Sequence, residues 1–164
     1  MKKSLLATTM CAALLSAGLA SCNQTPADFH IGISQFVAVD ALNDATRGFM
    51  DSVRSGMAKA GKTVDFDVQL ASGDISTCST IASSFVSKKK DLILANATPC
   101  LQAAANATAD IPILGTSITE FGVALGIEDV SHGTGINVSG TSDLAPLTEQ
   151  AKMTAEVFKD FYKK

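Results

Sequence analysis

The chain has 164 residues, a formal net charge of −3 and 46% hydrophobic residues, which suits a single domain with a core of its own. The mildly acidic balance argues against nucleic acid as a partner, because no basic patch is available to replace the counterions of phosphates. The sequence contains no dinucleotide-binding or phosphate-loop glycine motif and no nucleophile-elbow serine motif, so it gives little support to an enzyme and indicates no cofactor.

The amino terminus is predicted to be a secretory signal peptide, residues 1–21. Lys2 and Lys3 form a basic start, and an uncharged apolar run from Leu5 to Leu15 follows. This run is too short to span a bilayer as a mature helix. The ending before Cys22 resembles the bacterial lipobox, in which cleavage leaves a cysteine that carries lipid. We therefore expect an extracytoplasmic lipoprotein anchored to the membrane at Cys22; a plain signal peptide or a short anchor helix is the alternative.

The mature chain is predicted to begin with the lipidated cysteine and a polar tether, residues 22–29. Without the two signal-peptide lysines, eleven Lys and Arg face sixteen Asp and Glu, a net charge of −5. Cys78 and Cys100 are then the remaining thiols, and an extracytoplasmic compartment permits a disulfide between them. Both follow predicted helix starts, but spacing alone does not fix their geometry, so a bridge and two free thiols both stay open.

The first elements alternate between strand and helix. Residues 29–37 read as a strand, and residues 40–60 read as a helix that stops at Gly61. Residues 63–71 alternate polar and apolar side chains, which is typical of an edge strand with one solvated face. The turn at residues 73–74 then leads into a second helix. Its predicted buried side consists of Ile75, Ile81, Ala82, Phe85 and Val86.

Residues 91–99 are predicted to form a short, nearly all-apolar strand that ends in a small polar segment. A strand that is apolar on both faces fits a parallel sheet covered by helices on each side. Pro99 suits the first turn of a helix, here predicted to run over residues 101–109. Thr98 therefore lies where a strand ends and a helix begins, either as a helix cap or as a ligand contact.

The remainder of the chain continues the alternation. Residues 111–116 are predicted to be a fourth strand with a polar exit. The further expected elements are a loop with a brief helical piece at 122–133, a fifth strand at 134–139, a turn at 140–143 and a last amphipathic helix at 144–162.

The alternating order predicts an α/β fold built on a doubly wound parallel sheet. Right-handed crossovers place the carboxyl ends of all strands along one rim. This rim is expected to be rich in hydroxyls and amides and poor in charge, which favours a site that binds a small molecule without transforming it. His30 and His132 have no neighbour at metal-ligand spacing, so we interpret them as ordinary polar residues and expect no metal site.

Several segments together resemble the substrate-binding lipoproteins of bacterial ABC importers, in the branch whose known members bind tryptophan, tyrosine or phenylalanine. The similarity extends from about Ile31 to about Gln150. The segments that carry it are ISQFV (33–37), ASGD (71–74), DLILANATP (91–99) with the later Gln102, residues 110–119, and NVSGTSD (137–143).

This resemblance implies a type I periplasmic-binding-protein fold that closes on an amino acid, with residues 30–143 as the amino-terminal lobe. It implies an amino-acid ligand and an ABC permease as partners, in addition to the membrane at the lipid anchor. A carboxylate at a helix amino terminus beside an aromatic face is physically sensible. By motif position, Gln35 and Phe36 would lie near the ligand, Asn96, Ala97, Thr98, Thr116, Ser117 and Thr119 would bind its carboxylate, and Ser142 and Asp143 would lie near the hinge. Phe36 can equally be a core residue.

Two departures from the family pattern bear on function. After residues 36–37 the family usually has a His-Pro pair, and here Val39 and Asp40 follow instead. The second lobe is expected to be missing, because only the helix at residues 144–164 would belong to it. A truncated gene, a fragment, or a partner that supplies the other half are all open. The leading hypothesis is an extracytoplasmic solute-binding component of an ABC importer, and the alternative is a non-transport lipoprotein that acts as a one-lobe interaction module.

Overall fold

The computed structural model of the protein describes residues 27–159. The expected signal peptide (1–21), the lipidation site Cys22 and residues 160–164 lie outside the described residues. The chain folds into a five-stranded parallel sheet with the strand order β2-β1-β3-β4-β5. The strands are β1 (Phe29–Gln35), β2 (Val64–Leu70), β3 (Leu92–Asn96), β4 (Ile113–Ile118) and β5 (Val138–Ser142). The helices are α2 (Asp40–Lys59), α3 (Ile75–Ser87), α4 (Thr98–Ala107), α5 (Phe121–Leu125) and α6 (Leu147–Lys159).

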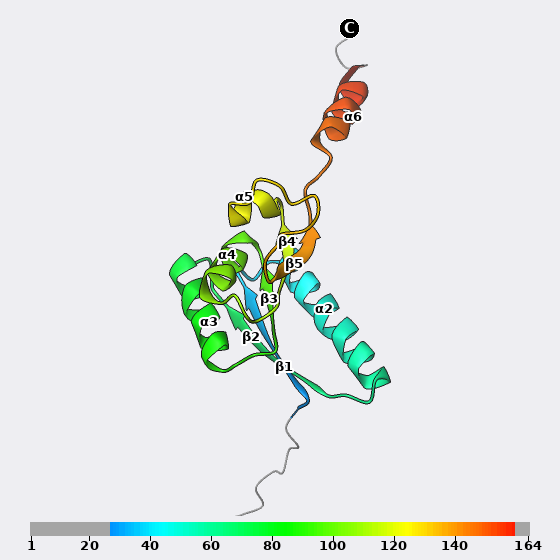
Figure 1. Ribbon diagram of the computed structural model, residues 1–164. Helices are drawn as coiled ribbons and strands as arrows, with labels where there is room; N and C mark the ends of the chain where they lie inside the picture. Colours follow the sequence, from blue (N-terminus) through cyan, green and yellow to red (C-terminus); the bar gives the residue numbers. More distant parts are fainter. Residues whose placement is uncertain (1–26, 160–164) are drawn as a thin grey trace, which may run out of the picture.

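Helices cover both faces of the sheet, as the doubly wound prediction requires (Figure 1). Helix α2 lies on one face, over a small core made by Ile31, Ile33 and Leu94. Helices α3 and α4 lie on the other face, where the larger core includes Ile93 and Ala95. Strand β3 thus buries alternate residues on opposite faces, which is why its sequence is apolar from Leu92 to Ala95, before the buried Asn96 at its end.

Close packing of β1 against α3 depends on Gly32. A Cβ atom at this position would lie 2.7 Å from the ring of Phe85, which is completely buried. Real Cβ contacts are much longer, so the missing side chain is what lets the ring approach the strand. The glycine in the first predicted strand is therefore explained by its helix partner.

Several boundaries differ from those predicted. Strand β5 occupies Val138–Ser142 and not residues 134–139. The segment just before it is a turn and a bend in which Gly133 and Gly135 have positive φ angles (102° and 71°), so extended strand backbone begins only at Val138. Helix α4 starts at Thr98 and ends at Ala107. Ile75, expected on the buried side of its helix, is 65% exposed, because it is the first residue of α3 and precedes the part of the helix that contacts the sheet.

The last helix, α6, begins at Leu147, directly after Pro146. It extends away from the sheet and its helices (Figure 1), and none of its described residues is buried. Its apolar residues Leu147, Met153 and Val157 are 67%, 64% and 58% exposed. None of the helices within residues 27–159 is long and apolar enough to cross a membrane.

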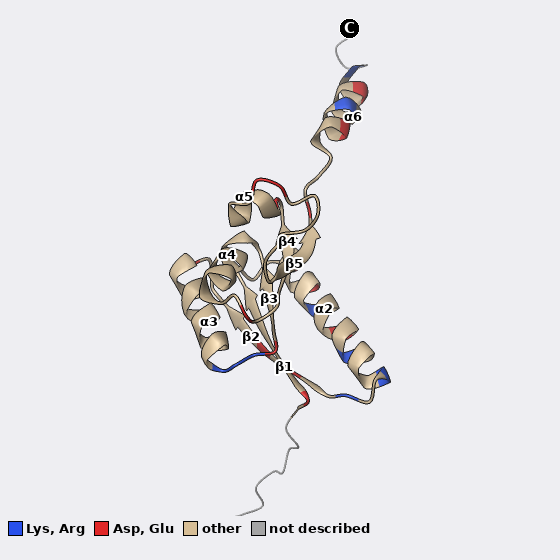
Figure 2. Cartoon of the chain, in the orientation of Figure 1, with Lys and Arg blue, Asp and Glu red and all other residues tan. Residues whose placement is uncertain are grey.

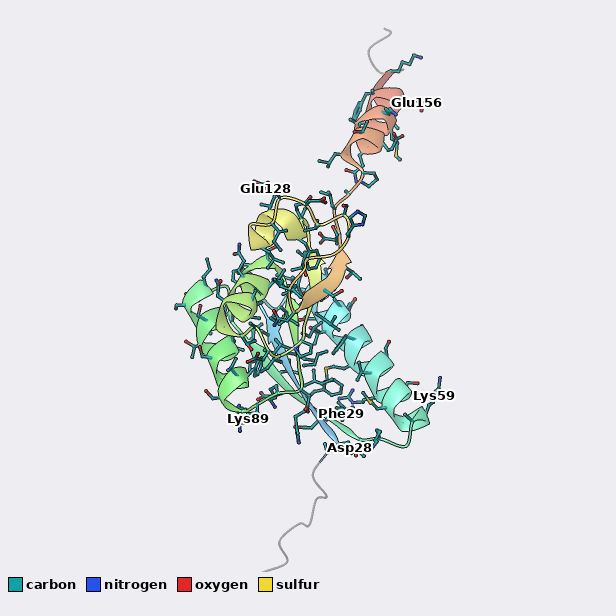
Figure 3. All side chains as sticks on the ribbon, in the orientation of Figure 1. Asp28, Phe29, Lys59, Lys89, Glu128 and Glu156 are labelled. Carbon is teal, nitrogen blue, oxygen red and sulfur yellow. The ribbon has the colours of Figure 1, made fainter. Side chains whose placement is uncertain are left out.

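Charged residues concentrate away from the middle of the sheet (Figure 2). Strands β3, β4 and β5 contain none. In Figure 3, Lys59 and Lys89 lie toward the same end of the molecule as Asp28, whereas Glu128 and Glu156 lie toward the opposite end. At the rim formed by the carboxyl ends of these three strands, the strand residues therefore supply hydroxyl and amide groups but no charged side chain.

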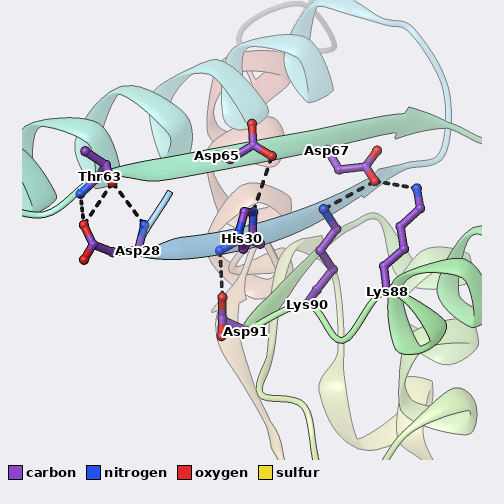
Figure 4. A network of polar contacts seen from close by, with 8 residues as sticks. All are labelled: Asp28, His30, Thr63, Asp65, Asp67, Lys88, Lys90 and Asp91. Carbon is purple, nitrogen blue, oxygen red and sulfur yellow. Dashed lines mark hydrogen bonds and ion pairs between the residues drawn. The ribbon is translucent and has the colours of Figure 1, made fainter. Parts of the chain in front are cut away.

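A network of polar contacts lies on β1, β2 and the segments that precede β1, β2 and β3, away from the rim (Figure 4). The Asp28 carboxylate accepts hydrogen bonds from the backbone N–H and the hydroxyl of Thr63, at 2.8 and 2.9 Å. The backbone hydrogen bond from Thr63, with help from the hydroxyl and from Lys62, lowers the pKa of Asp28 to about 2. His30 lies 3.6 Å from the Asp65 carboxylate on the surface, in keeping with an ordinary polar role.

Lys88 and Lys90 belong to the same network and share one acidic partner. Their amines lie 2.8 and 3.4 Å from the Asp67 carboxylate. The Lys90 side chain is only 8% exposed, so losing its acidic partner would destabilise the fold more than the same loss at the half-exposed Lys88. This network anchors the α3–β3 connection to the edge strand β2.

Candidate functional site

The rim at the carboxyl ends of the strands brings the predicted site residues of three neighbouring strands into line. Gln35, Asn96 and Thr116 are direct register partners across β1, β3 and β4. The pairing continues past the strand ends: the Phe36 N–H donates to Asn96 O at 3.2 Å and the Ala97 N–H donates to Thr116 O at 3.0 Å. Register partners on parallel strands project to the same face, so the three side chains share the α2 side of the sheet.

The Gln35 side chain is buried and engaged within the lobe. It is 5% exposed, and its Nε2 donates to Val37 O (2.9 Å) and Asn43 Oδ1 (2.7 Å). Its Oε1 accepts from the Thr46 hydroxyl at 2.7 Å. Both N–H donors of this amide are thus used by the chain itself. The expected proximity of Gln35 to a ligand stays a prediction.

The Asn96 side chain is likewise engaged, on the neighbouring strand. It is fully buried, and its Nδ2 donates to Leu42 O (2.8 Å) and to the Thr46 hydroxyl (3.0 Å). Its Oδ1 has no hydrogen-bond partner within residues 27–159. Together with Gln35, this amide holds the first half of α2 against the ends of β1 and β3.

Two members of this network, Asn43 and Thr46, were not singled out by the sequence reasoning. Thr46 is the only buried residue described on α2 and falls among the apolar positions of that helix, next to Leu42 and Phe49 by helical spacing. A hydroxyl on an apolar helix stripe needs a partner. The position of Thr46 among apolar residues is therefore the sequence feature that would have predicted a contact between α2 and the amides at the strand ends.

The start of α4 reaches the rim through an unusual backbone conformation. Ala97 precedes the helix with φ 94° and ψ 154°, a region rarely adopted by residues with a side chain. The Cys100 and Leu101 N–H groups both donate to Ala97 O at 3.1 Å. Thr98 is the first helical residue and no side chain caps this helix, so the interpretation of Thr98 as a cap is wrong. Its half-buried side chain lies at the positive end of the α4 dipole.

The exit of β4 contributes further hydroxyl groups. Ser117 adopts a positive φ of 57°, at a register shift between β4 and β5 that spans Gly115 and Ile118. Thr116 and Ser117 are half-buried and Thr119 is exposed. Kinks of this kind at strand ends re-aim side chains, and here three hydroxyl residues lie within the four positions 116–119 at the end of β4.

The exit of β5 is tied to that of β4. The Ser142 hydroxyl donates to Thr119 O at 2.7 Å and accepts from the Leu144 N–H at 3.1 Å. The Asp143 N–H donates to Ile118 O at 2.9 Å. Ser142 and Asp143 are both exposed and lie just before the segment that leads to α6. Their position fits the predicted hinge, a role that stays a prediction.

Phe36 and Asp74 border the rim on the β2 side. Phe36 is half-buried and packs against the larger core, and its carbonyl accepts from the Gly73 N–H at 2.8 Å. The Asp74 carboxylate caps α3 by accepting from the Ser76 hydroxyl, the Thr77 hydroxyl and the Thr77 N–H. These hydrogen bonds, the one from the Ser76 hydroxyl foremost, lower the pKa of Asp74 to about 2.

Two grooves border this region. One, of about 330 Å³, includes Gln35 and Thr46 and extends between α2 and the exposed Val68 and Leu70 of β2. The other, of about 370 Å³, includes Pro99 and lies among α3, α4 and α5. No group of three or more His, Cys, Asp or Glu side chains is arranged to hold a metal ion within the described part of the chain.

Comparison with known families decides the class of protein. Residues 30–163 match the family model described as ABC transporter substrate binding protein. The chain belongs to this family. As an ABC transporter substrate-binding protein, it is 46% identical to the "Tyrosine-binding protein" of Clostridioides difficile (strain R20291) over 114 residues, which are 70% of this chain and 33% of that protein.

Solved structures agree with the family and with the fold. The ligand-free, open structure of a Clostridium difficile substrate-binding protein with adhesive properties matches with a TM-score of 0.71 at 40% identity, over 79% of this chain and 43% of that one. An ABC domain from Streptococcus pneumoniae in complex with L-Trp matches with a TM-score of 0.67 at 32% identity, over 77% of this chain and 42% of that one.

This substrate-binding protein therefore spans a third of its curated relative and less than half of those solved chains. Its described residues form one lobe of the periplasmic-binding-protein type, which confirms the single-lobe fold expected from the sequence. The family resemblance inferred from the segments around the rim is confirmed as well.

Proposed function

We propose that the chain is the amino-terminal ligand-binding lobe of an extracytoplasmic ABC solute-binding protein that delivers an amino acid, with aromatic side chains favoured, to a permease. Family membership supports binding as the activity, and the names of two relatives, one tyrosine-binding and one in complex with L-Trp, support the ligand class. The proposal includes anchoring to the membrane by lipid at Cys22, after removal of residues 1–21.

The observation that carries the proposal is the alignment of the carboxyl ends of β3 and β4, two strands without charged residues, with the start of α4. A ligand carboxylate at the start of α4 gains the favourable end of the helix dipole and hydroxyl donors from Thr98 and Thr116. Gln35 and Asn96 act beneath it by fixing α2, since their N–H donors are already used. The remaining proposed contacts are Phe36 and Ala97 beside the ligand, Ser117 and Thr119 at the β4 exit, and Ser142 and Asp143 near the hinge.

A single lobe supplies half of a cleft. Ligand pockets normally bury most of a small ligand, and this chain corresponds to 42% of the L-Trp complex. We therefore expect the chain alone to bind weakly, with a dissociation constant on the order of 1 mM, and to bind tightly only together with a second lobe.

Weak binding of this kind is measurable by nuclear magnetic resonance on the chain carrying Cys22→Ser. Titration with L-Trp and L-Phe is expected to give saturable amide shifts at Thr98, Thr116 and their neighbours, while L-Lys gives none. Thr98→Val and Thr116→Val are expected to weaken binding several-fold. Thr80→Val, on the exposed face of α3, is the matched control. Absence of saturable shifts with any amino acid would contradict the proposal.

A second candidate is a non-transport lipoprotein that works as a one-lobe interaction module. The relative with adhesive properties favours it, as do the exposed apolar residues of α6. Affinity capture from solubilised envelope separates the two: recovery of a permease supports transport, and a stable homodimer without permease supports the interaction module.

A further inference from the structure

Two cysteines meet between α3 and α4. Cys78 lies in the first turn of α3 and Cys100 in the first turn of α4. Both are fully buried free thiols, and their sulfur atoms are 3.5 Å apart. They are the only cysteines within the described part of the chain. Neither contributes a donor to the rim, so the proposed binding function does not account for their contact.

The contact is close to what a covalent bridge requires. A disulfide needs sulfur atoms about 2.05 Å apart, so the two atoms must approach by about 1.5 Å. Both helices bury residues in the same core, which holds the two first turns together. The pair is 22 residues apart in sequence, so a bridge would remove much conformational freedom from the unfolded chain.

We propose that Cys78 and Cys100 form a structural disulfide when the chain folds in an oxidising compartment, linking the start of α3 to the start of α4. This inference rests on the extracytoplasmic location in the proposed function. The bridge joins the helices that follow β2 and β3, and so fixes the two helix starts that border the rim at Asp74 and Thr98. Its role is to stabilise this half of the ligand-binding lobe.

The timing of the reaction follows from burial. Burial raises the pKa of the Cys100 thiol to about 12, and the thiolate is the form that reacts. With both side chains inaccessible, the folded dithiol is expected to react with oxidants only through local opening. The bridge therefore forms during folding, while the thiols are still in contact with solvent.

The chemistry is thiol–disulfide exchange with a small-molecule disulfide such as oxidised glutathione. The first cysteine thiolate attacks that disulfide, forms a mixed disulfide and releases one reduced thiol. The second thiolate then attacks the protein sulfur of the mixed disulfide, forms the Cys78–Cys100 bond and releases the other reduced thiol. The two cysteines lose two electrons and two protons in total, and the external disulfide gains them.

The test uses the full chain with Cys11→Ser and Cys22→Ser, so that only the pair remains. Reduced, urea-unfolded chain is refolded with reduced and oxidised glutathione, then denatured, alkylated and measured by mass spectrometry. We expect no alkylation, the loss of two hydrogen atoms, and a Tm at least about 4 °C above that of the reduced protein. The folded, reduced chain in the same buffer is expected to form the bridge at least tenfold more slowly.

A refolded chain with two alkylated cysteines, or with glutathione adducts only, would overturn the proposal, as would a bridged chain with a lowered Tm. Cys100→Ala is the control and should carry a glutathione adduct or an alkyl group on Cys78. If refolding fails, trapping free thiols in chain exported to the periplasm of a bacterial host gives the same readout. The thiol state is measured without amino acid, so its failure is distinct from a failure of ligand binding.

Discussion

The hydroxyl of Thr46 donates a buried hydrogen bond of 2.7 Å to the side-chain carbonyl of Gln35. The same hydroxyl oxygen accepts from Asn96 Nδ2 at 3.0 Å. One residue of α2 thus joins the end of β1 to the end of β3, in the layer directly beneath the proposed ligand contacts. The rim is held in place by this network, so its integrity should be visible in stability as well as in binding.

Replacing Thr46 by valine tests the network. The substitution keeps the shape of the side chain but leaves one acceptor on Gln35 and one donor on Asn96 unpaired in the interior. We expect the free energy of unfolding to fall by about 1–3 kcal/mol, measured by urea denaturation. Thr80→Val on the exposed face of α3 should change it by less than about 0.5 kcal/mol. Equal effects of the two variants would show that the buried contacts carry no special weight.

Replacing Gly32 by alanine tests the packing of β1 on α3. The added methyl group would meet the Phe85 ring at 2.7 Å, so we expect a loss of about 1–3 kcal/mol. Phe85→Leu should cost less in the G32A background than in the wild type, which a double-mutant cycle measures. Gly48→Ala, with no atom within 4 Å of the added methyl, is the control and should stabilise α2 by about 0.5–1 kcal/mol. A neutral G32A variant would refute this packing.

Removing the carboxylate of Asp67 tests the ion pair with Lys90. Asp67→Ala leaves the Lys90 ammonium, 8% exposed, without its acidic partner, and we expect a loss of about 2 kcal/mol in urea denaturation. Asp65→Ala on the same strand removes a carboxylate from an exposed surface contact and should cost less than about 0.5 kcal/mol. If Asp65→Ala proved the costlier change, the pairing of Lys90 would not matter for stability.

The pH dependence of stability tests the capping of α3 by Asp74. The ionised carboxylate accepts hydrogen bonds from Ser76 and Thr77, and its pKa falls from 3.8 to about 2. A lowered folded pKa means that this contribution is fully present above about pH 4 and is lost as the pH falls toward 2. The Tm difference between wild type and Asp74→Ala should therefore shrink over this interval. Thermal melts at pH 7, 4 and 2.5 measure it, and a constant difference would exclude the charged cap.

The sequence by itself determined the architecture of this lobe. The apolar strand that became β3, the alternating pattern of β2 and the regular succession of helices predicted a doubly wound parallel sheet, because periodicity reports which faces are buried. The same reasoning placed the polar strand ends on one rim, since right-handed crossovers leave little choice. The family resemblance also depended only on local segments of sequence.

Only the tertiary structure decided how the rim residues are used. From motif position, Gln35 is expected near the ligand and Asn96 among the groups that bind its carboxylate, which stays a prediction. In the structure α2 packs over both amides, and Thr46 donates to the Gln35 carbonyl and accepts from the Asn96 amide. These contacts join residues far apart in the chain. The approach of Cys78 to Cys100 likewise depends on how α3 packs on α4. Sequence periodicity determines the face of a strand or helix on which a side chain lies. Its hydrogen-bond or packing partner depends on how separate elements pack together. The local sequence pattern around one residue does not contain that information.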